Sequence, residues 1–191
     1  MSWYLDIKTR ESWAYAPNCF TPEECDLIIE LGSKLKLKEG EITGDKLINS
    51  EIRQSKVAFF NPEDKSTEWI FRRVTDFIGS INKQFWNFDL QYIETLQFTT
   101  YKDSNDFYGK HTDQYFASPH YRKISFSVQL SDPSNYEGAD LLMYFLNKPS
   151  PTRRDRGDIV LFPSFVLHEV TPLTKGERYS LVGWVCGPPF R

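Results

Sequence analysis

The chain has 191 residues and a formal net charge of −3, so it lacks the overall basic field that attracts nucleic acid. A hydrophobic content of 40% and an aromatic content of 16% are typical of a packed globule and exclude a disordered chain. No stretch approaches the ~20 consecutive apolar residues of a membrane-spanning helix. We therefore expect a soluble protein without nucleic-acid or membrane partners.

The cysteines are sparse. Cys19, Cys25 and Cys186 have neither the paired spacing of a zinc site nor the pattern of a disulfide framework. Residues 1–15 include several charged side chains and no long apolar run, so they do not have the composition of a secretory signal. These two observations indicate a reducing, cytoplasmic compartment.

Residues 1–88 are expected to form two helices with short strands between them. The first helix is predicted to begin after Thr21, because Pro22 at the first helical position and Glu24 three residues after the cap are start signals. It is predicted to end at Gly40. A second helix over about 67–86 is predicted from apolar residues at three- and four-residue spacing. The expected strands are 2–7 and 52–60. The apolar residues of the first helix, at helical spacing, are Leu27, Ile28, Leu31 and Leu35.

The second half of the chain alternates apolar and polar residues and is rich in β-branched and aromatic side chains, which predicts strands. Turn signals with glycine, proline, serine and aspartate separate these strands. Many strands, with helices confined to the first half, predict one domain built as an antiparallel sandwich or barrel backed by helices. The expected strands are 90–101, 110–112, 123–130, 140–145, 158–162, 168–171 and 178–185.

His111, Asp113 and His168 are the candidate metal ligands. His111 and Asp113 are two residues apart, so on an extended strand both side chains point to the same face. Two imidazoles and one carboxylate bind one face of an octahedral metal and leave other positions open, as in non-haem Fe(II) oxygenases. A closed structural site uses four protein ligands. The third histidine, His120, lies between a proline and a tyrosine in an expected loop and is not assigned to the metal.

Taken singly, each candidate ligand is more often a surface or hydrogen-bonded side chain. The set is strengthened by Arg178, which follows His168 by ten residues and precedes the apolar run 181–185. A strand that enters the core there would bury the arginine, and a buried arginine needs an anion. The carboxylate of a 2-oxo acid suits it. The turn at 172–176 is expected to place the strands of His168 and Arg178 side by side, with Ser180 on the same face as Arg178.

Together, His111-Thr112-Asp113, His168 and Arg178-Tyr179-Ser180 resemble the 2-oxoglutarate- and Fe(II)-dependent dioxygenase superfamily, in its prolyl 4-hydroxylase-like branch. Residues 136–141 are similar to the Gly-Gly-x-Leu turn of that family, with Ala139 in place of the second glycine. Residues 155–163 are similar to the strand that precedes its distal histidine. Tyr101 matches the tyrosine that hydrogen-bonds the cosubstrate in this branch. The resemblance covers roughly residues 90–190, about half of the chain.

The resemblance implies an α+β, mainly β fold: a double-stranded β-helix (jelly-roll) at about 89–191, with supporting N-terminal helices at about 1–88. It implies Fe(II) held by His111, Asp113 and His168, with no catalytic residue beyond the metal centre. It also implies 2-oxoglutarate and O₂ as cosubstrates, with ascorbate as a candidate further cofactor. The C5 carboxylate of 2-oxoglutarate is expected at Arg178, with Tyr101 and Ser180 assisting. Collagen-type prolyl hydroxylases have a lysine at the position of Arg178, which weakens the transfer of the exact substrate.

The implied activity is hydroxylation of an unactivated carbon, with peptidyl proline as the first candidate substrate. A free amino acid or small metabolite is the alternative. A cupin-like barrel that binds metal without turnover is the rival class, although it would be expected to supply further histidine or glutamate ligands. The candidate substrate residues are Tyr115, Phe116 and Trp184, for which core or lid packing is the competing interpretation. The sequence predicts no oligomeric state.

Overall fold

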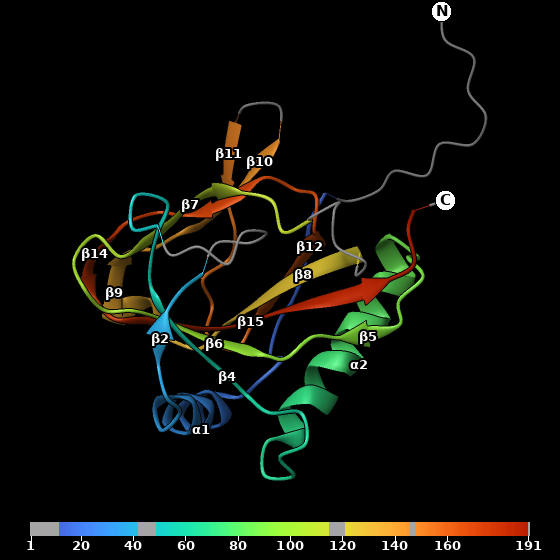
Figure 1. Ribbon diagram of the computed structural model, residues 1–191, viewed down its shortest axis with the longest axis horizontal. Helices are drawn as coiled ribbons and strands as arrows, with labels where there is room; N and C mark the ends of the chain where they lie inside the picture. Colours follow the sequence, from blue (N-terminus) through green and yellow to red (C-terminus); the bar gives the residue numbers. More distant parts are fainter. Residues whose placement is uncertain (1–11, 42–48, 115–120, 146–147, 191) are drawn as a thin grey trace, which may run out of the picture.

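Two antiparallel β-sheets face each other, and two helices cover the outer face of the larger sheet (Figure 1). The computed structural model describes residues 12–41, 49–114, 121–145 and 148–190, and every structural statement below refers to these residues. The strand predicted at 2–7 lies outside them.

The larger sheet contains, within the described ranges, eight strands that are all paired antiparallel. Its central strand, β15, pairs with β8 on one side and with β6 on the other. The strand order is β1 (Ala14–Ala16), β12 (Ile159–Pro163), β8 (Tyr121–Gln129), β15 (Arg178–Gly187), β6 (Gln97–Tyr101), β4 (Lys56–Phe59) and β2 (Lys38–Glu39), and β5 (Tyr92–Ile93) pairs with the far end of β15.

The smaller sheet lies over the inner face of the larger one (Figure 1). Its strand order is β11 (Lys148–Pro151), β10 (Leu141–Phe145), β13 (His168–Val170), β7 (Phe107–His111) and β3 (Arg53–Gln54). A separate two-stranded pair is formed by β9 (Tyr136–Gly138) and β14 (Leu173–Gly176). Strand β9 directly follows a short 3₁₀ helix at Pro133–Asn135. This arrangement confirms the predicted mainly β jelly-roll.

Helix α1 (Pro22–Ser33) begins as predicted. The Thr21 hydroxyl accepts a hydrogen bond from the Glu24 amide at 3.2 Å, and the Glu24 carboxylate accepts one from the Thr21 amide at 2.9 Å. This capping box satisfies two amides that the helix cannot pair internally. The helix ends at Ser33, so the prediction that it reaches Gly40 was wrong, and Leu27 is 44% exposed instead of facing the core.

Helix α2 (Glu68–Phe85) matches the predicted range 67–86, with Thr67 and Trp86 as its caps. Its apolar stripe packs with α1 and with the outer face of the larger sheet, so one core joins the helices to the sheet. Neither helix of the described chain is long and apolar enough to cross a membrane. The buried residues of the stripe are Ile70, Val74, Ile78 and Ile81.

Strand β12 shows why two separate cores form. Ile159 and Leu161 belong to the core beneath the helices, whereas Val160 and Phe162 belong to the core between the sheets. Side chains alternate across a strand, so a sheet that is covered on both faces has apolar residues at consecutive positions. The larger sheet is therefore a central layer between the helices and the smaller sheet.

Two predicted strands are each divided. The range 52–60 forms β3 in the smaller sheet and β4 in the larger sheet, with Ser55 between them, and 90–101 forms β5 and β6. The predicted pairing of the strands of His168 and Arg178 was wrong. Strand β13 belongs to the smaller sheet and β15 to the larger, and 173–176 forms β14 instead of a turn. The two residues therefore come from facing sheets.

Candidate metal centre

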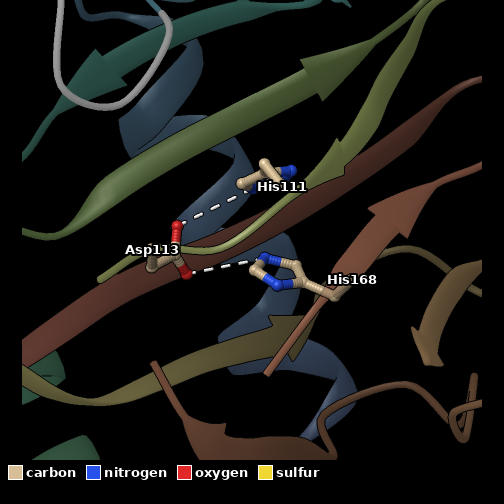
Figure 2. A group of neighbouring side chains, drawn as sticks. All are labelled: His111, Asp113 and His168. Carbon is tan, nitrogen blue, oxygen red and sulfur yellow. Dashed lines mark ion pairs between the residues drawn. The ribbon is translucent and has the colours of Figure 1, made fainter. Parts of the chain in front are cut away.

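His111, Asp113 and His168 lie together between the sheets (Figure 2). His111 ends β7 and pairs directly with His168 at the start of β13. Asp113 follows β7 and is anchored by its backbone amide, which donates to the Ser164 carbonyl at 2.9 Å. The carboxylate lies 3.7 Å from His111 Nε2 and 3.5 Å from His168 Nε2. All three candidate ligand atoms lie within 4.8 Å of one another.

The donor atoms of this cluster fit a divalent cation. His111 Nδ1 lies 2.7 Å from the Gly109 carbonyl, and His168 Nδ1 lies 2.9 Å from the Val166 carbonyl. A carbonyl oxygen can only accept, so each Nδ1 carries the proton and donates it. In a neutral imidazole of this tautomer, Nε2 presents a lone pair toward Asp113, and this is the form that binds a metal.

The charges of the cluster also suit a cation. Burial, reinforced by the neighbouring His168, lowers the pKa of His111 to about 3, so this imidazole is neutral. Burial alone would raise the pKa of Asp113, but His168 and His111 outweigh it and hold the pKa of this carboxyl below its ordinary value. A neutral imidazole beside an ionised carboxylate is ready to bind a metal without first losing protons.

Aromatic rings hold the two imidazoles in place. The Tyr108 ring stacks on His111 with centroids 3.6 Å apart, and the Phe162 ring lies 4.6 Å from that of His168. Tyr108 is on the same strand as His111, and Phe162 is on β12 of the facing sheet. Both sheets therefore fix the directions in which the histidines point.

The cluster opens into a cavity of about 500 Å³, its mouth included. Every predicted cofactor residue lines this cavity: Arg178, Tyr101 and Ser180. Trp184, a predicted substrate residue, also lines it. The other two, Tyr115 and Phe116, lie outside the described residues, as does His120.

Arg178 is only 1% exposed and is held by a neutral side chain. Its Nε and Nη2 both donate to the Gln129 amide oxygen, at 3.2 and 3.0 Å. Within the described part of the chain, no carboxylate lies within ion-pair distance of Arg178. Because a buried cation is unfavourable without a counter-charge, the guanidinium is suited to an anionic ligand in the cavity.

Tyr101 lies beside this guanidinium. The two residues are opposite each other in the pairing of β6 with β15, and the guanidinium carbon is 5.4 Å from the ring centre. Burial raises the pKa of Tyr101, although the charge of Arg178 opposes this, so the phenol keeps its proton. Ser180 is two residues beyond Arg178 on the same face of the sheet, opposite Gln129. Two hydroxyl-bearing residues, Tyr101 and Ser180, therefore lie close to the arginine on the same sheet.

Trp184 has a buried indole N–H without a hydrogen-bond partner in the described ranges. Its ring packs under the Arg122 guanidinium, 4.0 Å from the ring centre, and Arg122 makes a two-point ion pair with Glu94 at 2.8 and 2.7 Å. An unpaired buried donor is costly. The indole N–H of this cavity-lining residue therefore still lacks an acceptor among the described residues.

Sequence reasoning missed Gln129, Tyr108 and Arg53, each of which contacts or lines the site. The polar residues Ser125, Ser127 and Gln129 alternate along a central strand, and this pattern was a usable signal of a polar wall. Arg53 had no such signal, because it lies at the point where one expected strand becomes two.

A jelly-roll that brings two histidines and one carboxylate to an open cavity is typical of mononuclear non-haem metal oxygenases. Residues 96–186 match the family model of the 2OG-Fe(II) oxygenase superfamily. The match includes all three clustered side chains and Arg178. This region of the chain, which includes the candidate site, is similar to the 2OG-Fe(II) oxygenase superfamily.

Curated relatives match over a similar region. A PKHD-type hydroxylase of Prochlorococcus marinus (strain MIT 9515) is 36% identical over 81 residues, which cover 42% of this chain and 37% of that protein. PKHD-type hydroxylases of Idiomarina loihiensis and Synechococcus sp. (strain CC9902) are 38% and 41% identical, each over 42% of this chain and 37% and 36% of their own lengths. The matched region is thus well under half of each relative.

Solved structures resemble the fold over nearly the whole chain. A Pseudomonas putida prolyl-4-hydroxylase has a TM-score of 0.69 at 20% identity and covers 93% of this chain and 94% of its own. A Trichoplax adhaerens prolyl hydroxylase, in complex with a peptide fragment of the hypoxia inducible factor oxygen degradation domain, has a TM-score of 0.73 at 19% identity, with 92% and 83% covered. At these identities the likeness establishes a shared fold.

Proposed function

We propose that the protein is an Fe(II)- and 2-oxoglutarate-dependent dioxygenase that hydroxylates an unactivated carbon. One observation carries the proposal: a single cavity joins a two-histidine, one-carboxylate cluster to a buried arginine that has no carboxylate partner among the described residues. A metal site alone would fit many proteins. A metal site next to an unpaired cation fits a dicarboxylate that binds both.

In this proposal, His111, Asp113 and His168 hold Fe(II). Bound Fe(II) and 2-oxoglutarate supply the oxidising chemistry, in which O₂ oxidises a substrate C–H bond while 2-oxoglutarate is converted to succinate and CO₂. The protein contributes placement and shielding. The Gly109 and Val166 carbonyls fix the histidine tautomers, and residues of the two sheets form the walls of the cavity.

Arg178 binds the distal carboxylate of 2-oxoglutarate. Gln129 takes two of its N–H groups through one oxygen, and the remaining donors, which have no acceptor among the described residues, suit the ligand. Tyr101, a neutral phenol, and Ser180 add hydroxyl donors to the same carboxylate. Uncharged neighbours leave the positive charge of the arginine for the cosubstrate.

Peptidyl proline is the proposed substrate, and a free amino acid or small metabolite is the alternative. The fold shared with prolyl hydroxylases supports proline, and one of those structures contains a peptide fragment. Trp184 is the proposed contact, since it lines the cavity and its buried indole N–H, which has no acceptor among the described residues, suits a substrate carbonyl. Tyr115 and Phe116 remain predicted substrate contacts from the sequence.

The proposal includes a cellular location and a reductant. All three cysteines of the chain are buried free thiols, which supports a reducing, cytoplasmic location. We retain ascorbate as a proposed reductant.

We also propose a single dioxygenase domain, supported by the core that the helices share with the larger sheet. Residues 1–88 supply strands β1 to β4 to this domain in addition to both helices.

The deciding experiment uses the protein without oxygen. Adding Fe(II) and 2-oxoglutarate should produce a weak visible metal-to-ligand charge-transfer band, and admitting air should then release succinate. Absence of both the band and succinate would contradict the oxygenase proposal and favour a metal-binding barrel without turnover. Peptides containing proline and free amino acids can then be screened by mass for a product that gains one oxygen atom.

A further inference from the structure

A second arginine, Arg53, lines the same cavity and has no assigned role. It is 7% exposed and lies on β3, directly opposite Tyr108 of β7. Its guanidinium carbon is 4.4 Å from the centre of the Tyr108 ring, and that ring stacks on His111. Arg53 is therefore separated from the metal centre by a single aromatic ring.

Ser55, Glu41 and Gly40 hold the guanidinium of Arg53 in one position, which we call its seat. Its Nε donates to the Ser55 hydroxyl at 2.8 Å, and its Nη1 donates to the Glu41 backbone carbonyl at 2.8 Å. Gly40 forms the back of the seat, because a Cβ at this position would lie 2.3 Å from the Arg53 Nε. These contacts fix the direction of the guanidinium, as preorganised binding groups require.

None of these contacts neutralises the charge. The serine and the backbone carbonyl are uncharged, and within the described ranges no carboxylate lies within ion-pair distance of Arg53. Its Nη2 also has no acceptor among the residues that the structure describes. A fixed, buried cation with an open donor beside a cavity is an anion site that still needs its anion.

The charges around the cavity lead to the same conclusion. Apart from the histidines, the ionisable acids and bases that line it among the described residues are Asp113, Arg53, Arg178 and the tyrosines. A divalent cation and doubly charged 2-oxoglutarate cancel each other, and Asp113 balances one arginine. Among the described residues one positive charge is then left at the wall, and an anionic substrate would neutralise it.

We propose that the substrate carries a carboxylate and that Arg53 binds it. This inference rests on the proposed function, since it assigns Arg178 to the cosubstrate and leaves Arg53 for the substrate. A guanidinium pairs with a carboxylate more strongly than with a neutral amide, because the hydrogen bonds are charge-assisted. The seat is inside the cavity wall, so the carboxylate lies close to the carbon that reacts.

The first test uses the full chain loaded with Zn(II), which does not turn over, and saturated with 2-oxoglutarate so that Arg178 is occupied. Acetate is the probe, with acetamide and sodium chloride of equal ionic strength as controls. Acetate should raise the melting temperature in a dose-dependent way, and acetamide should not. If 2-oxoglutarate itself gives no stabilisation, the proposed function fails and the inference with it. If 2-oxoglutarate stabilises and acetate does not, only the carboxylate site is overturned.

Three variants place the acetate effect at Arg53. Arg53→Met should weaken acetate binding about tenfold or more, while Arg53→Lys should keep much of it because the charge remains. Gly40→Ala should also weaken it, because the new Cβ displaces an intact guanidinium. Retained acetate binding in both Arg53→Met and Gly40→Ala would contradict the assignment. Binding of 2-oxoglutarate serves as the folding control and should change by less than about fivefold.

Matched acid and amide pairs identify the source of the carboxylate. L-proline against L-prolinamide tests a free amino acid, and the capped peptide amides Glu-Pro-Gly against Gln-Pro-Gly test an acidic peptide. In one pair the acid should bind the loaded protein about tenfold more tightly than its amide, and Arg53→Met should remove that preference. Equal binding of acid and amide in both pairs would overturn the substrate class.

Discussion

The buried Arg178 is held by the neutral amide of Gln129, whereas a buried arginine more commonly forms an ion pair with a carboxylate. Gln129 directs the guanidinium through two hydrogen bonds to one oxygen and adds no negative charge. A carboxylate at this position would stabilise the arginine and at the same time compete with an anionic ligand. The neutral partner thus keeps the charge available to the cavity.

Replacing Gln129 tests this reasoning. In Gln129→Glu, the new carboxylate should pair with Arg178 and weaken 2-oxoglutarate binding by about tenfold or more relative to Gln129→Leu. Gln129→Leu removes the acceptor without adding charge and should have the milder effect. Calorimetric titration of the Zn(II)-loaded variants with 2-oxoglutarate measures both. Wild-type affinity in Gln129→Glu would show that the cosubstrate does not use Arg178.

Arg178 itself gives a second prediction. Arg178→Met keeps the length of the side chain but loses its charge and donors, so the apparent 2-oxoglutarate requirement should rise by about tenfold or more. Arg178→Lys is the matched control and should retain part of the affinity. Zn(II) binding should be unchanged in both variants, because Arg178 is not among the clustered donors. An unchanged requirement in Arg178→Met would place the cosubstrate clamp elsewhere.

At the residue scale, spacing and scarcity made the cluster predictable. The chain has only three histidines, and His111 and Asp113 are two residues apart at the end of one strand. Arg178 was predictable because an apolar run follows it. The sequence did not predict the roles of Gln129, Tyr108 and Arg53. These roles depend on which strands lie side by side, and that pairing is not encoded locally.

At the element scale, local signals were reliable where the physics is local. The cap of α1 was predicted from Thr21 and Glu24, which bond to each other within one turn. The end of α1 was not, because Gly40 is needed for a different reason, the seat of Arg53. The range 52–60 was read as one strand since nothing in its apolar pattern marks the change of sheet at Ser55.

The turn before β10 gives a prediction about stability. Gly138 has φ +74°, and a Cβ there would lie 2.2 Å from the Pro172 carbonyl oxygen. Gly138→Ala should therefore lower the free energy of unfolding by at least about 2 kcal/mol. Ala139 already has φ +49°, so Ala139→Gly is the matched control and should change stability by less than about 1 kcal/mol. Urea unfolding measures both, and equal losses would contradict the argument.

At the scale of the whole molecule, the site is divided between the two layers. His111 and His168 lie on strands of the smaller sheet, whereas Arg178 and Tyr101 lie on the larger one. Asp113 joins them, because its backbone amide donates to the carbonyl of Ser164, the residue that follows β12 of the larger sheet. A ligand that binds both the metal and Arg178 would therefore connect the two sheets across the cavity.

This division predicts a coupled effect on stability. Zn(II) at a concentration one hundred times its dissociation constant should stabilise the fold by about 2.7 kcal/mol, or about 5–10 °C in melting temperature. Adding 2-oxoglutarate should raise the melting temperature further when both the metal and Arg178 are present, since the ligand then binds both layers. His111→Ala should lose both increments, and Arg178→Met should lose the second one only. Calorimetric scans of the three proteins measure the increments, and an undiminished response to 2-oxoglutarate in His111→Ala would refute the coupling.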